Sequence, residues 1–411
     1  MRKRNILIFV LLMALLLSSC GSGASRAQIN DKIEPDTSLT LENMPSEKDI
    51  FGETRISFAA VGDHIIHEAV YTDAKNNATL YASETGKSVR YRFTDMYEGV
   101  ADIIKAADLS YVNHETPVAG DSFGISGYPD FNAPNEVGDD LSEVGFDIIN
   151  IANNHMLDMG EAGYRNSIEY WKNKSQEKDF TFIGGFTKSD YDNVRFIEKD
   201  GVKIALLSYT TLINYSHAND LSRGSELLVP YANEADMTRQ VGIAKEGGAD
   251  LIIVAMHWGD ENAFEPNAAQ KRYAEHLASL GVHVILGSHS HTLQPVEWIE
   301  GENGHRTLCA YSLGNFLSTM HYSYYMVGGI LTFDIVQDDE GRTSIEAPIL
   351  VPMMCHYSMT RDSLKLYTLE NYTEELMNSH GSQLKGSFNM NTLYGYVTKT
   401  IDDEFLPDFF K

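Results

Sequence analysis

Three histidines in this 411-residue chain follow aliphatic runs that are typical of buried strands. His257 follows residues 251–255, and His289 and His291 follow residues 282–286. On an extended segment, a His-x-His pair points both rings to the same side, because side chains alternate faces with period two. Neutral imidazole suits transition-metal ions such as Zn, Fe or Mn. The three histidines therefore predict a site for one or two divalent transition-metal ions.

A second candidate group follows the predicted strand at residues 148–151. The amide oxygen of Asn154 could ligate a metal ion, while the adjacent His155, off the metal, would donate a proton or a hydrogen bond to the reacting group. Asp158 lies three residues further on and could orient the His155 ring, as carboxylates do for imidazoles in metal sites. The alternative is a capping turn into the helix that we expect from residue 162 onward.

Two acidic residues complete the predicted site. Asp63 ends the first predicted strand, and Glu115 follows the second. Two divalent ions held close together need an anion between them, and we expect Glu115 to provide this bridge. His67 and Asn113 are further candidates near these strand ends. Trp258 lies beside the predicted site and could stack on substrate, although packing is the commoner role for such a side chain.

Aliphatic strands that alternate with helical patterns must position these residues, and this alternation is typical of an α/β fold. The candidate ligands come directly after strands, which is where open α/β sheets bind ligands. The predicted strands cover residues 56–61, 109–112, 148–151, 180–183, 202–208, 251–255, 282–286, 308–311 and 329–335. The predicted helices cover residues 96–107, 162–172, 233–246 and 268–280, with Asp95 and Asn267 as N-caps.

Six motifs occur in order along the chain, and their order is more specific than any one of them. They are Gly62-Asp63, Asn113-His114-Glu115-Thr116-Pro117, Ala152-Asn153-Asn154-His155-x-x-Asp158-x-Gly160, His257-Trp258-Gly259, Gly287-Ser288-His289-Ser290-His291 and Tyr311-Ser312-Leu313-Gly314-Asn315-Phe316. Together, from about residue 56 to residue 336, they resemble the CapA family of poly-γ-glutamate capsule proteins.

The CapA family in turn resembles the calcineurin-like metallophosphoesterases. This resemblance implies an α/β fold of the four-layer α/β/β/α sandwich type, with a dinuclear metal centre and with His155 as acid or transition-state donor. The implied metal ligands are Asp63, Glu115, Asn154, His257, His289 and His291. Phosphoesterases usually have Asp-x-His after the first strand and Gly-Asp-x-x-Asp after the second, whereas this chain has isoleucine at position 65 and Asn-His-Glu at residues 113–115. The number of metal ions therefore stays open.

The N-terminal residues predict a membrane-anchored lipoprotein. Three basic residues precede an apolar run at residues 6–17, which is short for a membrane span and typical of a signal peptide. The run leads into Leu-Ser-Ser-Cys, which resembles a bacterial lipobox. Residues 1–19 would then be the signal peptide, and Cys20 would carry the lipid chains that anchor the protein outside the cytoplasm. The alternative is an ordinary cleaved signal peptide.

The rest of the chain is expected to contain one large domain with appendages. Residues 20–50 are poor in large apolar side chains and predict a flexible tether. Residues 51–358 are expected to form the CapA-like domain with the metallophosphoesterase fold. Residues 359–411 are expected to be an extension that is packed on this domain or partly mobile.

Composition narrows the choice of partners. The formal charge is −26 at pH 7, and it becomes −29 without the three basic residues of the signal peptide. Nucleic acid is therefore excluded as an expected partner, because it would be repelled. A polyanion would be held only at a locally positive place, and bound divalent metal creates one. Cys309 and Cys355 are expected to be buried thiols, with a disulfide between them as the alternative.

Two functions are consistent with these residues. With metal bound, the simplest chemistry is hydrolysis, in which bound water is activated as hydroxide and His155 protonates the leaving group. The bond cleaved could be a phosphoester, a γ-glutamyl amide or a cell-wall peptide bond. The alternative is a non-catalytic assembly, export or anchoring component. The expected partners are an anionic polymer such as poly-γ-glutamate or cell-wall peptide, the membrane, and a capsule synthase complex.

Overall fold

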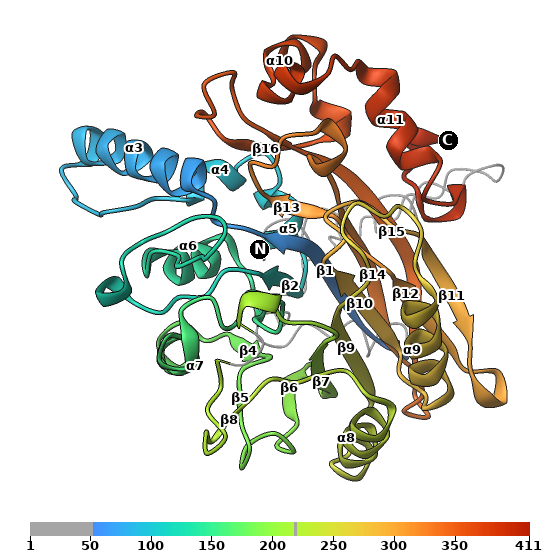
Figure 1. The fold of residues 1–411 in the computed structure, drawn as a ribbon. Helices are drawn as coiled ribbons and strands as arrows, with labels where there is room; N and C mark the ends of the chain where they lie inside the picture. Colours follow the sequence, from blue (N-terminus) through green and yellow to red (C-terminus); the bar gives the residue numbers. More distant parts are fainter. Residues whose placement is uncertain (1–51, 218–219) are drawn as a thin grey trace, which may run out of the picture. The chain divides into compact units, whose positions relative to one another are not determined.

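Two mixed β-sheets lie at the centre of the unit from Glu53 to Lys411 (Figure 1). The structure is a computed structural model that describes residues 52–217 and 220–411. The predicted signal peptide, the lipidated Cys20 and the predicted tether lie outside the described residues. Within the described ranges, no helix has both the length and the apolar character needed to cross a membrane.

The first sheet carries the candidate carboxylates. Over the described residues its order is β16-β15-β14-β1-β2-β3-β4, and β13 pairs with the end of β1. Strands β1 to β4 are parallel, whereas β14, β15 and β16 each run antiparallel to their neighbours. The bounds are β1 (Thr54–His64), β2 (Leu109–His114), β3 (Ile148–Asn150), β4 (Thr181–Ile183), β13 (Asn315–Leu317), β14 (Val327–Gln337), β15 (Thr343–His356) and β16 (Lys365–Thr368).

The second sheet carries the candidate histidines. Its order is β11-β12-β10-β9-β7-β6, with parallel strands in the middle and antiparallel β11 and β6 at the edges. The bounds are β6 (Arg195–Lys199), β7 (Val202–Thr210), β9 (Leu251–His257), β10 (Val284–Ser288), β11 (Val296–Glu300) and β12 (Arg306–Ala310). A small ribbon pairs β5 (Phe186–Thr187) with β8 (Leu227–Leu228). Each strand predicted from the sequence overlaps an observed strand.

The sheets bury their inner faces against each other and are covered by helices on their outer faces. Ile204 and Ile253 of the second sheet share one core with Ile148 and Ile330 of the first. The neighbouring Val254 faces the other way, because strand side chains alternate, and packs in a second core with residues of α8 and α9. Figure 1 shows α6 and α7 on one side of the sheets and α8 and α9 on the other. The predicted α/β fold of four layers is confirmed.

Three of the four predicted helices correspond to helices of the described residues. The helices of the described residues are α3 (Glu68–Thr85), α4 (Thr94–Tyr97), α5 (Ala101–Ala106), α6 (Glu136–Val144), α7 (Gly160–Lys178), α8 (Glu234–Glu246), α9 (Ala268–Ser279), α10 (Glu374–Ser379) and α11 (Met390–Thr398). The predictions for residues 162–172, 233–246 and 268–280 correspond to α7, α8 and α9. Asn267 caps α9 in a capping box with Gln270, as predicted.

The predicted single helix at residues 96–107 is wrong, because α4 and α5 are separate. Gly99 lies between them, against the backbone of Leu366, where a Cβ would be 2.1 Å from the carbonyl oxygen. This close contact between distant parts of the chain interrupts the helix. Asp95 is not an N-cap as predicted; it lies inside the first turn of α4, and Phe93 precedes that turn.

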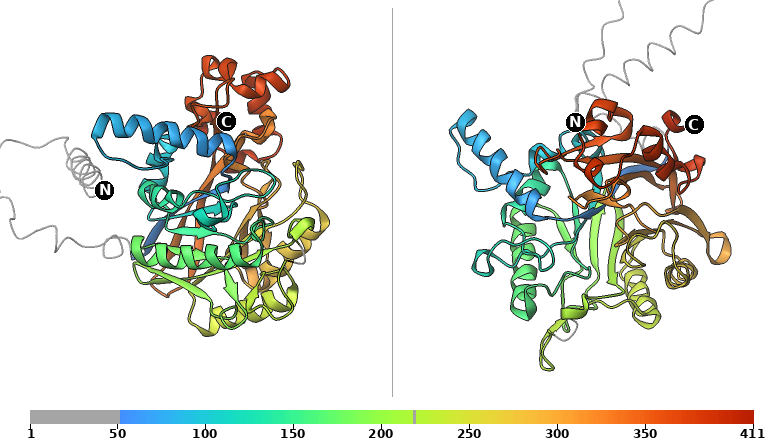
Figure 2. Two further views of the ribbon diagram at one scale, coloured as in Figure 1. Left: turned by 60° about the vertical axis from the view of Figure 1, so that its left-hand side comes forward. Right: turned by 45° about the horizontal axis from the view of Figure 1, so that its top comes forward.

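The long helix α3 was not predicted from the sequence, whereas residues 359–411 were expected to be packed on the domain or partly mobile. The long helix α3 buries few apolar residues, such as Val70 and Ala74, so its apolar stripe is too narrow to show a clear helical period. Residues 359–411 add β16 to the first sheet, and Leu393 and Val397 of α11 belong to its core. Figure 2 shows this C-terminal segment, coloured red, with its helices gathered at one end of the sheets.

The two cysteines of the described residues are both free. Cys309 lies in β12 and Cys355 in β15, and both side chains are fully buried. The Cys355 thiol donates to the carbonyl oxygen of Ser318 at 3.1 Å. The prediction of two buried thiols is confirmed, and the disulfide alternative is wrong.

Replacing Gly99 by alanine should destabilise the protein by about 3 kcal/mol, since the new methyl group would overlap a backbone atom that cannot rotate away. Urea unfolding would measure this loss. Gly395 in α11 provides the matched control, because its Cβ would meet nothing within 4 Å. Gly395→Ala should stabilise by about 0.5–1 kcal/mol, as alanine is the better helix residue. Equal effects of the two changes would contradict the contact between Gly99 and the C-terminal segment.

Candidate metal centre

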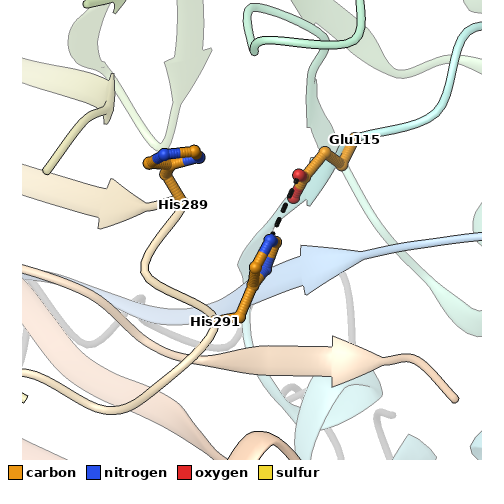
Figure 3. Close-up of side chains that lie close together, drawn as sticks. All are labelled: Glu115, His289 and His291. Carbon is orange, nitrogen blue, oxygen red and sulfur yellow. Dashed lines mark ion pairs between the residues drawn. The ribbon is translucent and has the colours of Figure 1, made fainter. Parts of the chain in front are cut away.

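Strand ends from both sheets bring the predicted ligands together. Asp63 lies in β1 and Glu115 directly follows the parallel neighbour β2. His257 ends β9, and His289 and His291 follow its parallel neighbour β10. All five side chains are buried. Figure 3 shows His289 and His291 beside the carboxylate of Glu115, with His291 joined to it as an ion pair.

Gly62 explains why the end of β1 lies so close to the rest of the site. A Cβ at this position would be 1.9 Å from the carbonyl oxygen of Gly314, so only glycine allows the two segments to touch. The backbone N–H of Asp63 donates to the same oxygen at 2.9 Å. The following residue, Asn315, is thereby placed with its Oδ1 atom 3.1 Å from His291 Nδ1.

Glu115 lies at the centre of the group. Its Oε1 atom is 3.9 Å from His155 Nε2, 4.0 Å from His257 Nε2 and 3.8 Å from His291 Nε2. These separations are too long for hydrogen bonds. The distances to His257 and His291 suit ligands of a common ion, because two ligands each about 2.1 Å from one metal lie at most about 4.2 Å apart.

Several candidate ligand atoms are buried without a hydrogen-bond partner in the described part of the chain. Both Glu115 carboxylate oxygens and His289 Nδ1 are buried without a hydrogen bond among the described residues. Buried polar atoms without a partner are costly, and a bound ion would satisfy them. Glu115, His289 and His291 offer ligand atoms within 4.8 Å of one another, as do Asp63, Glu115 and His257. These imidazole and carboxylate donors fit a divalent transition-metal ion.

Asp63 is held in place by donors on three sides. Its Oδ2 atom is 3.0 Å from His291 Nδ1 and accepts from the backbone N–H of His289 at 3.2 Å. Asn113 donates from Nδ2 to Asp63 Oδ1 at 2.8 Å, and Asn150 donates to Asn113 Oδ1 at 2.8 Å. Asn113, a candidate from the sequence, therefore orients the Asp63 carboxylate and does not face Glu115 directly.

His257 and Asn154 meet across the site. His257 Nε2 is 2.7 Å from Asn154 Oδ1, the predicted ligand atom, and the Asn154 amide donates to Asn214 Oδ1 at 2.8 Å. The other His257 nitrogen, Nδ1, is 2.9 Å from the hydroxyl of Ser288. Sequence reasoning missed the positioning roles of Asn214 and Ser288. Ser288 lies inside the Gly-Ser-His-Ser-His motif, but no sequence signal points to Asn214.

His155 and Asp158 form the predicted pair. His155 Nδ1 is 2.7 Å from Asp158 Oδ2, and that oxygen also accepts from the backbone N–H of Phe131 at 2.9 Å. The carboxylate therefore places the imidazole proton on Nδ1 and leaves Nε2 directed at Glu115. The two residues occupy turns that precede α7, so a local turn and a proton-donating pair occur together here.

The His-x-His segment is not extended, in contrast to the prediction. β10 ends at Ser288, and His289 and His291 have positive φ angles of 97° and 58°. Both rings still reach the site, with centroids 6.0 Å apart, because the chain turns between them. Such backbone angles are unfavourable for residues other than glycine and cluster at functional sites.

Burial and charge shift the pKa values of the site in opposite directions. Burial raises the pKa of Glu115 well above its ordinary value, and the charge of Asp63 raises it further. Burial lowers the pKa of His257 well below its ordinary value and that of His289 to about 3. Burial also opposes the charged form of His291, but Glu115 and the hydrogen bond to Asp63 outweigh it and raise its pKa to about 9. A cation is thus favoured beside the two carboxylates.

A family model described as "Bacterial capsule synthesis protein PGA_cap" matches residues 57–320, which include every predicted ligand. The chain belongs to this family. It is 28% identical over 239 residues to the capsule biosynthesis protein CapA of Bacillus anthracis, and 26% identical over 237 residues to the PGA biosynthesis protein CapA of Bacillus subtilis. Each alignment covers 56% of this chain, and 54% and 57% of those proteins. The chain thus spans about half the length of these curated relatives.

Solved structures resemble this PGA_cap family member more distantly. The NAD nucleotidase of Haemophilus influenzae is 16% identical with a TM-score of 0.43, over 87% of this chain and 57% of that one. The calcineurin-like phosphoesterase YfkN of Bacillus subtilis is 15% identical with a TM-score of 0.44, over 84% of this chain and 96% of that one.

Three residues of this PGA_cap protein lie outside the ligand group. His64 Nδ1 is 2.9 Å from His114 Nδ1 and its Nε2 is 2.7 Å from the Tyr97 hydroxyl, so it points away from the site. His67 accepts at Nδ1 from the backbone N–H of Thr319 at 3.3 Å. Trp258 is fully buried and donates to the carbonyl oxygen of Tyr311 at 2.8 Å, so it packs rather than stacking on substrate.

Proposed function

We propose that this capsule-family protein is a metal-dependent hydrolase that acts outside the cytoplasm on an anionic polymer of the capsule or cell wall. The observation that carries the proposal is the pairing of two features. A buried group of imidazoles surrounds Glu115, whose carboxylate oxygens have no hydrogen-bond partner within the described ranges, and a separate His155–Asp158 pair faces the same carboxylate. Metal binding alone would not need this second pair.

The residues of the site have two roles, metal binding and proton donation. Asp63, Glu115, Asn154, His257, His289 and His291 would hold one or two divalent ions of Mn, Fe or Zn type. When bound, the ions would supply a hydroxide from water and polarise the oxygen of the scissile group. His155 would protonate the leaving group from Nε2 in its doubly protonated form, while its Nδ1–H donates to Asp158 Oδ2. Glu115 would lie between the two ions.

The charge of the protein favours binding of an anionic substrate only at the candidate metal centre. The chain as a whole carries −26 and repels polyanions. One or two divalent ions bound beside His291 would reverse the sign of the charge locally, so the polymer would be attracted to the site and repelled from the remaining surface. The membership of the capsule synthesis family supports poly-γ-glutamate or a cell-wall peptide as the polymer.

The second candidate function is a non-catalytic assembly, export or anchoring component of a capsule synthase complex. This function is favoured by the residues at the end of β1. His64, the only histidine of that strand, contacts His114 and does not face the site. The next residue is Ile65, at the position where phosphoesterases have a histidine ligand. A centre with fewer ligands would hold the polymer without cleaving it.

An assay of the metal-loaded chain would decide between the two functions. The purified full chain would be incubated with poly-γ-glutamate and with a generic phosphodiester, after chelation and again after Mn²⁺ or Zn²⁺ is restored. Hydrolysis that disappears with chelation and returns with metal is the expected result. Metal-dependent binding of poly-γ-glutamate without turnover of either substrate would instead support the assembly role.

We also propose that Cys20 anchors the protein, and replacing it by alanine should move the protein from the membrane fraction to the soluble fraction. A cysteine with two or more acyl chains holds a protein on the membrane stably, whereas the same chain without lipids has no comparable attachment. Cell fractionation with an antibody would measure the distribution. Cys309→Ala, at a buried thiol of β12, is the matched control and should stay in the membrane fraction. A Cys20→Ala protein that still sediments with membranes would contradict the anchor.

A further inference from the structure

Arg361, in the segment after β15, forms no ion pair with an acidic residue in the part of the chain that the structure describes. Nine of the eleven arginines of the described residues form ion pairs with Asp or Glu. Of the other two, Arg223 is exposed and Arg361 is half-buried. In a chain with 58 acidic and 32 basic residues, a half-buried guanidinium without a carboxylate is unusual. It is therefore a candidate for binding an anion from outside the chain.

Two acidic residues that contact the segment around Arg361 accept from other donors. Asp362 accepts from the hydroxyls of Ser358 and Thr360, which close a tight turn. Asp73 accepts from the backbone N–H groups of residues 363 and 364, at 3.0 and 2.9 Å. The same turn holds Arg361 at a φ of 61°, which is unfavourable for a residue with a side chain. The fold thus keeps the guanidinium apart from its acidic neighbours.

Three hydrogen-bond donors around Thr319 have no acceptor among the residues that the structure describes. Arg361 donates from Nη2 to the Thr319 carbonyl oxygen, but its Nε–H and the Thr319 hydroxyl are buried without a partner among the described residues. His67 Nδ1 accepts from the Thr319 N–H, so the ring proton is on Nε2, for which the described residues offer no hydrogen bond. An oxyanion, which only accepts hydrogen bonds, matches this set of donors.

These donors lie beside the metal centre. The Phe131 ring packs between the His67 ring, at 5.4 Å, and the His155 ring, at 4.8 Å between centroids. Burial, and then the nearby His291 and Arg361, lower the pKa of His67 to about 3, so the ring is a neutral donor at ordinary pH. The group therefore extends the site from His155 toward the C-terminal segment.

We propose that Arg361, Thr319 and His67 form an oxyanion-binding subsite that holds a carboxylate or phosphate group of the substrate next to the metal centre. The proposal rests on the proposed function in that both sites take the same substrate. A planar guanidinium can bind a carboxylate or phosphate through two N–H groups, which fixes the orientation of the bound group. Residues 359–411, which supply Arg361, would then select the substrate.

Binding of small anions to the metal-loaded full chain would test the subsite. Isothermal titration calorimetry with inorganic phosphate and with γ-glutamylglutamate would be run on the wild type, Arg361→Gln, Arg361→Lys and Arg342→Gln. Arg361→Gln should bind the preferred probe at least about 10-fold more weakly, as expected for a lost hydrogen bond to a charged group. Arg361→Lys replaces the planar guanidinium, which can donate two parallel hydrogen bonds, by a compact ammonium group and should weaken binding of the probe about 3-fold or more. Arg342 is the control, because it lies in the connection between β14 and β15, at the end of the sheet opposite the Asp63 end of β1.

The outcomes separate the subsite from the hydrolase proposal. Binding of phosphate alone indicates a phosphate group in the substrate, and binding of the dipeptide alone indicates a carboxylate. Equal affinity of the wild type and both Arg361 variants for both probes, or no binding to the wild type, would overturn the subsite. So would loss of metal from Arg361→Gln, which would place Arg361 at the metal centre instead. If Arg361→Gln does not fold, the lysine variant decides. If the wild type is inactive but binds a probe through Arg361, the hydrolase proposal is contradicted and the subsite proposal is not.

Discussion

Replacing Glu115 by glutamine is expected to remove most of the bound metal and, in the metal-free protein, to raise the melting temperature. The carboxylate is close to three imidazoles, with Nε2 atoms at 3.8–4.0 Å from Oε1, and neither oxygen accepts a hydrogen bond from residues 52–217 or 220–411. Glutamine keeps the shape but loses the charge that would bridge two ions. Because changing residues outside the ligand set already costs 10–100-fold in affinity, we expect a loss of about 100-fold or more.

The effect on stability should reverse with metal. Without metal, Glu115 is buried beside Asp63, so removing its charge should stabilise the fold by about 1–3 kcal/mol. This gain should shrink as the pH falls, because a carboxyl whose folded pKa is raised is destabilising above its unfolded pKa and neutral below it. With metal at 100 times its Kd, binding stabilises the wild type by about 2.7 kcal/mol, which the variant lacks.

Metal analysis by mass spectrometry and melting curves in chelator and in Mn²⁺ or Zn²⁺ would measure both effects. Asp140→Asn is the matched control, since Asp140 is a buried carboxyl with a pKa raised to about 7 by burial, but it lies on α6 and accepts from Phe93 N–H. Its metal content and its stabilisation by metal should equal those of the wild type. A Glu115→Gln protein with full metal content would refute the central role of Glu115.

The sequence predicted the strand ends that carry the candidate ligands better than the tertiary contacts between distant segments. The aliphatic runs that precede Asp63, Glu115 and His257 are long and regular, so their strand ends were clear, and parallel strands bring such ends together. The turn at His289 and His291 was not foreseen. Its positive φ angles depend on the surrounding fold and not on any local preference of histidine.

The missed features share a physical cause. Gly99 interrupts a helical pattern because Leu366, far along the chain, occupies the space of a Cβ. Asn214 contacts Asn154 across 60 residues of sequence, and Arg361 contacts Thr319 across 42. Such positions depend on tertiary contacts between segments with no common pattern, whereas periodicity reports only local structure. For this reason the C-terminal segment carried no chemical signal in the sequence.

Replacing His155 by alanine is expected to lower turnover of the cleaved substrate by about 10²–10⁴-fold while metal content stays unchanged. A positioned proton donor contributes about this factor. His155 is held by Asp158 through Nδ1, at 2.7 Å, and its Nε2 is 3.9 Å from Glu115, at the edge of the ligand group. The reacting group would therefore meet this nitrogen while the ions remain bound by the other histidines.

The Asp158→Asn variant tests whether His155 acts as a proton donor or has only a structural role. It keeps the size of the side chain and removes the charge that fixes the His155 tautomer, so turnover should fall by less than in His155→Ala, with metal still bound. His276, a half-buried residue of α9 whose Nε2 is 3.2 Å from the carbonyl oxygen of Glu234 in α8, provides the control, and His276→Ala should retain full turnover. If His155→Ala loses metal together with activity, His155 is a ligand. If turnover and metal content are both unchanged, the proton is supplied by another group, and the His155–Asp158 pair is a capping turn that happens to face the site.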